Sequence, residues 1–128
     1  MTLSTLALAG LIGLAGALGA LARYSLGRFI AERTGAQFPL GTLLINVTGA
    51  LVIGLLFALS GRHVLTSVMQ SIFATGFRGG YTTFSTMSWE AVQLARGGST
   101  SRSLLYLGGN VALGLCAVVL GLMLGWWL

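Results

Sequence analysis

The chain has 128 residues, of which 55% are hydrophobic and only 7% are charged, and its formal net charge is +5. Ordinary soluble domains carry about 25% charged residues, so this composition excludes a soluble fold and predicts an all-α, multi-pass protein of the inner (plasma) membrane. In a membrane protein the arginines mark helix ends and interfaces, and they do not indicate a nucleic-acid partner.

The first two apolar runs each predict a helix that crosses the lipid bilayer. Residues 3–22 are uncharged and long enough to cross about 30 Å of hydrocarbon. Pro39 suits the start of a second helix over residues 40–60, where Thr42, Asn46 and Gly49 fall on one face. The glycines of the first run predict a face for close helix packing, formed by Gly10, Gly13, Gly16 and Gly19.

The third segment, residues 65–95, is too long for one straight crossing, because a continuous helix of that length would measure roughly 45 Å. Its centre falls at Gly79-Gly80, inside the stretch 76–86 that is rich in glycine and hydroxyl groups. Lipid tolerates an irregular backbone only where protein or a cavity surrounds it. The segment is therefore predicted to be a transmembrane helix broken at mid-membrane.

Residues 96–102 have the composition of a loop, and residues 104–127 predict a fourth helix with Tyr106 and Asn110 one turn apart. The result is a single four-helix transmembrane domain over residues 1–128. So short a chain cannot easily enclose a pathway alone, and its glycine faces favour an oligomer.

The polar residues within the predicted spans are mostly neutral hydrogen-bond donors, which replace the water around an anion without holding it too tightly. Threonine and serine hydroxyls also bond back to their own helix, and asparagines also join helices, so a purely structural role stays open for each. Glu90 is expected to pair with an arginine, and Arg78 to reach a wet vestibule. No catalytic motif is present, so we do not expect an enzyme. Candidates for an ion pathway are Asn46, Thr83, Phe84, Ser85, Met87, Tyr106 and Asn110, and candidates for structural or vestibule roles are Arg23, Thr42 and Glu90.

Three stretches of the chain resemble the Fluc (CrcB) family of fluoride channels, and the resemblance covers the whole length. They are GALARY at residues 19–24, GTLLINVTG at 41–49 and GFRGGYTTFSTM at 76–87. The resemblance implies an antiparallel, dual-topology homodimer with two pores and one central structural sodium ion. It places that sodium on the backbone carbonyls of Gly79 and Thr82.

The same resemblance assigns a polar pore group to Asn46, the first of two stacked phenylalanines to Phe84, and a polar track to Tyr106 and Asn110. Met87 stands where the family has its second phenylalanine. The predicted function is a fluoride-selective channel that lets fluoride leave the cytoplasm passively and so protects against fluoride toxicity.

Two other functions remain open from the sequence. A small proton-coupled multidrug exporter of cationic compounds would also have four spans, but it needs an acid in its first helix, and residues 1–22 contain none. An accessory subunit that only packs against a larger membrane partner would show no transport by itself.

Overall fold

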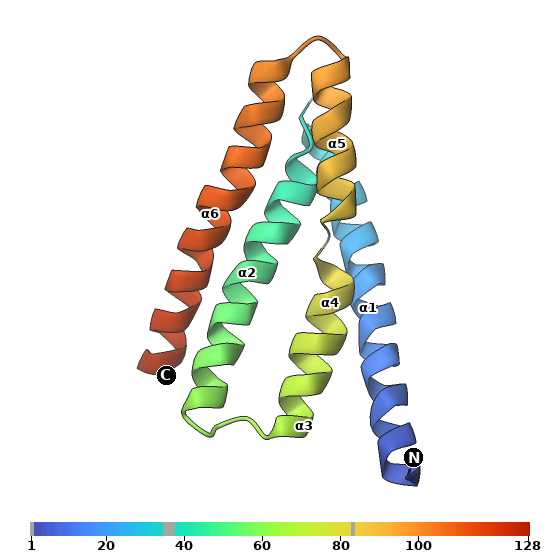
Figure 1. The fold of residues 1–128 in the computed structure, drawn as a ribbon, viewed down its shortest axis with the longest axis vertical. Helices are drawn as coiled ribbons and strands as arrows, with labels where there is room; N and C mark the ends of the chain where they lie inside the picture. Colours follow the sequence, from blue (N-terminus) through green and yellow to red (C-terminus); the bar gives the residue numbers. More distant parts are fainter. Residues whose placement is uncertain (1, 35–37, 83) are drawn as a thin grey trace.

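The computed structural model describes residues 2–34, 38–82 and 84–128, and the regular elements within these ranges are all helical. Three helices are long and apolar enough to cross a membrane: α1 (Leu3–Thr34), α2 (Leu40–Gly61) and α6 (Thr100–Trp127). At 1.5 Å per residue α2 is roughly 33 Å long, close to the thickness of the hydrocarbon core. Both termini lie at the same end of the bundle, opposite the connection between α5 (Ser85–Arg96) and α6 (Figure 1).

Helix α1 does not end near Ala22, as the hydropathy pattern predicts for the span, but continues to Thr34. An ion pair one turn apart supports the extension, with Arg28 Nε and Glu32 Oε1 separated by 3.0 Å. Arg33 also stacks its guanidinium over the Phe29 ring at 4.6 Å. The last turns of α1 are therefore polar, and their length exceeds what the hydrocarbon core alone requires.

The predicted loop at residues 96–102 is mostly helical. Helix α5 continues to Arg96, and α6 already begins at Thr100, so the connection is residues 97–99. The Ser99 hydroxyl caps α6 by accepting a hydrogen bond from the Arg102 backbone N–H at 3.4 Å. Gly98 has φ +90°, a backbone angle that glycine adopts without strain, and it makes the turn. The serine and threonine run is thus a helix cap and first turn.

The third segment is broken, as predicted, but the break lies a few residues beyond the glycine pair. Its first part comprises α3 (Ser67–Gln70), the π-helix η1 (Ser71–Arg78) and the short α4 (Gly79–Tyr81), and its second part is α5. The backbone becomes extended at Thr82, with φ −82° and ψ 156°. The Thr82 backbone N–H and hydroxyl both donate to the Arg78 carbonyl, at 2.9 and 3.1 Å. The helix therefore ends at Thr82, whose hydroxyl bonds to a helix carbonyl. Gly79, three residues earlier, keeps helical backbone angles.

The glycines of this segment serve close helix packing. A Cβ on Gly80 would collide with the Gly16 carbonyl, and a Cβ on Gly19 would collide with the Phe77 carbonyl. The prediction of a small-residue packing face on α1 is confirmed for Gly16 and Gly19. Gly10 and Gly13 have no neighbouring atom within 4 Å of such a Cβ. Helix α1 is therefore held against η1 and α4 by backbone-to-backbone contact.

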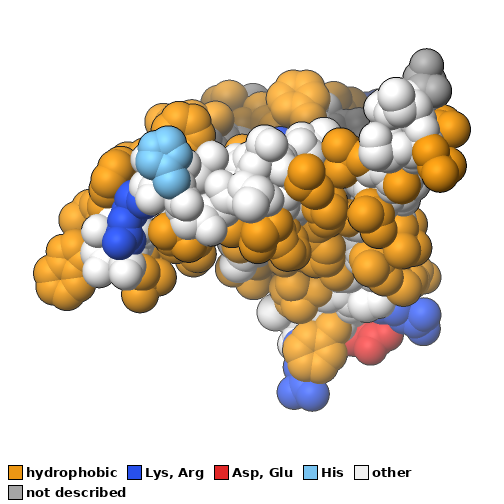
Figure 2. Space-filling view, turned by 90° about the horizontal axis from the view of Figure 1, so that it is seen from below, with side chains coloured by type: hydrophobic (Ala, Val, Ile, Leu, Met, Phe, Trp, Pro, Cys, Tyr) orange, Lys and Arg blue, Asp and Glu red, His pale blue; other side chains and the backbone are white. Residues whose placement is uncertain are grey.

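Helices α2 and α6 form the other close pair and lie side by side along their length (Figure 1). A Cβ on Gly54 would collide with the Val118 carbonyl, and one on Gly121 with the Leu51 carbonyl. Ile45 and Tyr106 are almost fully buried between the helices. The outer surface is largely hydrophobic (Figure 2), as expected where lipid or a second copy replaces water.

Candidate ion-binding groove

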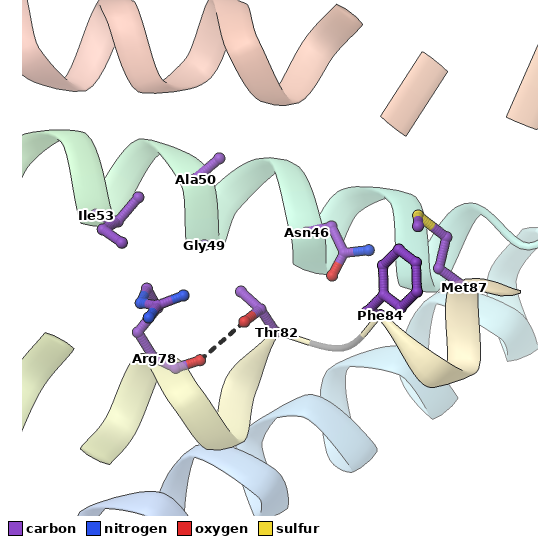
Figure 3. Close-up of a pocket in the computed structure, with 8 residues that line it drawn as sticks. All are labelled: Asn46, Gly49, Ala50, Ile53, Arg78, Thr82, Phe84 and Met87. Carbon is purple, nitrogen blue, oxygen red and sulfur yellow. Dashed lines mark hydrogen bonds between the residues drawn. The ribbon is translucent and has the colours of Figure 1, made fainter. Parts of the chain in front are cut away.

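A groove of about 300 Å³ runs between α2 and the broken segment. Polar groups from both sides meet in it beside two large apolar side chains (Figure 3). Its lining residues are Asn46, Gly49, Ala50, Ile53, Arg78, Thr82, Phe84 and Met87. Three of the predicted pathway residues, Asn46, Phe84 and Met87, therefore come together from elements far apart in sequence.

The amide of Asn46 is held in place by the fourth helix. Its Nδ2 donates to Asn110 Oδ1 at 3.1 Å, and Asn110 Nδ2 donates to the Tyr106 carbonyl at 2.8 Å. Asn110 is 7% exposed, so its amide lies inside the protein. The structure thus links three predicted pathway residues, with Asn110 orienting Asn46 toward the groove.

Thr42 and Glu90 form a second polar contact, one turn from Asn46 along α2. The Thr42 hydroxyl donates to Glu90 Oε1 at 2.5 Å. The expected pairing of Glu90 with an arginine is wrong, because the ion pair found among the described residues joins Arg28 and Glu32. Glu90 accepts from a hydroxyl on α2 because α5 packs against α2 and α6.

Tyr106 lies directly behind this pair. Its ring is fully buried and meets the Phe38 ring edge-on, with centroids 5.6 Å apart. Its hydroxyl is close to Thr42 and Glu90 but makes no hydrogen bond of good geometry among the described residues. A buried hydroxyl of this kind can turn its O–H toward an ion or a water molecule.

Phe84 and Met87 differ in how much of each side chain is exposed in the single chain. Phe84 is 78% exposed, whereas Met87 is partly buried. Both also line an apolar cavity of about 370 Å³ between α5 and α6. A large ring with so little contact in its own chain is not a core residue. Thr83 and the side chain of Ser85 lie outside the described part of the chain.

Arg23 lines a neighbouring cavity of about 390 Å³ with Thr42 and Thr86. Thr42, Thr86 and Glu90 also line a further cavity of about 410 Å³. The predicted vestibule residues Arg23, Thr42 and Glu90 are thus near one another through Thr42. Thr86 belongs to the polar residues of the predicted spans but was not assigned a role from the sequence, and the structure places it in both cavities beside Thr42.

Comparison with known proteins agrees with the fold. Residues 10–122 match the family model described as "CrcB-like protein, Camphor Resistance (CrcB)". The chain belongs to the CrcB-like family. One relative, from Acidobacterium capsulatum, is 46% identical over 106 residues, covering 82% of this chain and 85% of its own length. It is called "Fluoride-specific ion channel FluC".

Two more CrcB relatives are similar over the same share of this chain. A protein from Thermus thermophilus is 43% identical over 105 residues, covering 82% of this chain and 83% of its own, and is called "Fluoride-specific ion channel FluC". One from Leifsonia xyli is 48% identical over 105 residues, covering 82% and 77%, and is called "Fluoride-specific ion channel FluC 1". The resemblance inferred from the motifs is therefore confirmed.

The resemblance implies a sodium ion at the break in the third segment, and the backbone carbonyls there can be compared with what a sodium ion requires. Helix α4 ends at Tyr81, and the last carbonyls of a helix lack helical partners. Gly79 is exposed, and a Cβ there would meet open space, so the backbone can be approached closely. Such carbonyls are suitable oxygen ligands for Na⁺. The Gly79 and Thr82 carbonyls would supply two of the oxygen ligands that a sodium ion needs, and two oxygens alone do not surround a cation.

Proposed function

We propose that this chain is a fluoride-selective channel through which fluoride leaves the cytoplasm down its gradient. The observation that carries the proposal is the 46% identity, over most of both chains, with a relative named as a fluoride-specific ion channel. The groove supports it, because Asn46 and Thr82 place neutral polar groups beside the Phe84 ring. No catalytic step is part of the proposal.

Selectivity in this proposal follows from the type of ligand in the groove. Amide donors replace the hydration of a small anion, and the electropositive edge of an aromatic ring adds a weak attraction; the Thr82 hydroxyl would join them by turning its proton away from the Arg78 carbonyl. Neutral donors bind weakly enough for the ion to leave again. Larger anions form weaker hydrogen bonds, so they regain less of the free energy lost with their water.

We further propose that two copies pair in antiparallel orientation, giving two pores along the shared interface. The exposed Phe84 ring and the open Gly79 backbone support this pairing, since each is left without a cover in one chain. The Gly79 and Thr82 carbonyls of the two copies would together hold one sodium ion, whose charge would offset the repulsion between the facing carbonyl dipoles.

The transport claim is tested with purified protein in liposomes. Fluoride release measured with a fluoride electrode should be far faster than chloride release from matched liposomes. Protein-free liposomes give the background leak. Equal release of chloride would contradict the proposed selectivity.

The assembly claim is tested by labelling tags on both termini with an impermeant reagent. Tags on the same terminus should be reached from both faces of the membrane. Labelling from one face alone would exclude the antiparallel homodimer. Replacing sodium by a bulky organic cation should weaken the dimer, and an unchanged dimer would refute the sodium site.

A further inference from the structure

Among the described residues that line the groove, Arg78 is the only charged one, and neither the neutral pore groups nor the proposed sodium site uses it. It is the last residue of η1, and its side chain is partly buried. Its guanidinium points toward α2, below Gly49 and Ile53 (Figure 3). A charged side chain within an otherwise apolar membrane segment needs a specific partner.

The described part of the structure leaves most of the Arg78 donors available. A guanidinium has five N–H groups. Nε donates to the Ala74 carbonyl at 3.1 Å, which fixes the stem of the side chain against its own helix. The terminal nitrogens make no hydrogen bond or ion pair to another described residue. The free donors therefore face the groove and not the protein interior.

The position of Arg78 limits the partner that can reach it. It lies near the middle of the broken segment, far from both ends of the bundle, so a lipid headgroup does not extend to it. The groove holds about 300 Å³, room for a small ion with a few water molecules at about 30 Å³ each. Arginine binds oxyanions and halides through its N–H groups. The partner that fits is a small inorganic anion.

Arg78 also stands apart from the Asn46 end of the groove. Asn46 and Ile53 are two helical turns apart, roughly 10 Å along α2, and Arg78 lies at the Ile53 end. We propose that the Arg78 guanidinium forms a second anion site in the groove, binding a small monovalent inorganic anion. At about 10 Å and an effective dielectric constant of about 20, its charge also raises anion occupancy at Asn46 about tenfold. Two weak sites in series favour passage of ions through a pore.

The test measures anion binding without transport. Crystals of the full chain grown in sodium bromide should show bromide anomalous density beside the Arg78 guanidinium, and added sodium fluoride should reduce it. Arg78→Gln should lose the density, whereas Arg78→Lys should keep it. Arg96→Gln, which removes an exposed arginine outside the groove, should leave the density unchanged.

Two results would overturn the site: no bromide at Arg78 in the unaltered protein, or equal density in Arg78→Gln. The inference goes beyond the proposed function, and the two fail separately. Bromide at Arg78 in a protein that releases no fluoride would contradict only the channel. Fluoride release without bromide at Arg78 would contradict only this site.

Discussion

The contact between α1 and the broken segment makes a quantitative prediction at Gly19. In Gly19→Ala the new Cβ would collide with the Phe77 carbonyl oxygen and lie 3.0 Å from the Tyr81 backbone nitrogen. These are backbone atoms, so no side chain can turn aside, and α1 must move away by about 1 Å to restore ordinary contact. Gly13→Ala is the matched control on the same helix, because nothing lies within 4 Å of its Cβ.

The expected free energies follow from two opposing effects. Alanine favours a helix over glycine by up to about 1 kcal/mol at both positions. Overpacking at Gly19 costs about 1–3 kcal/mol, at the upper end here because the obstacle is backbone. Gly19→Ala should therefore be less stable than Gly13→Ala by about 2–3 kcal/mol.

Reversible unfolding in mixed detergent and dodecyl sulfate micelles, followed by circular dichroism, measures this difference. Fluoride release should also fall in Gly19→Ala, because η1 and α4 position the residues that line the groove. Equal unfolding free energies for the two variants would show that α1 does not pack on η1 and α4 as described, and would refute the reasoning.

Three further predictions concern the groove. Phe84→Ile should change the folding stability of the single chain little, because the ring is 78% exposed there, yet it should lower fluoride release about tenfold. Met87→Phe should keep fluoride release, and full release by a folded, assembled Phe84→Ile variant would exclude a pore role for Phe84. Asn110→Leu should lower the free energy of unfolding by about 1–2 kcal/mol, since the partly buried Asn46 amide and the Tyr106 carbonyl each lose a hydrogen bond to the side chain; an unchanged free energy of unfolding would contradict that link. Thr42→Val should lower the free energy of unfolding by about 1.5–3 kcal/mol because it removes the hydroxyl that donates to Glu90. Thr42→Ser should keep the hydroxyl and the original stability, and equal stability of the two variants would exclude the contact.

Helix existence could be predicted from the sequence because it depends on local features. Apolar runs of membrane-spanning length identify α1, α2 and α6, and the predicted bounds of α2 differ from the observed ones by a single residue at Gly61. The density of glycine and hydroxyl groups indicated that the third segment is broken. Helical hydrogen bonds join residues four apart, so composition within a few residues carries this information.

Only the tertiary structure decided how those helices are used. The glycine that seemed to mark the break, Gly80, instead allows α1 to approach, and Thr82 ends the helix. The Glu90 partner proved to be Thr42, 48 positions away in the chain. Such pairings depend on which helix faces meet, and burial selects those faces from the whole set of interhelical contacts. The direction of the Arg78 side chain likewise could not be predicted from the sequence. The local sequence allows it to point to any side of the helix, and the packing of η1 against α1 turns it toward the groove.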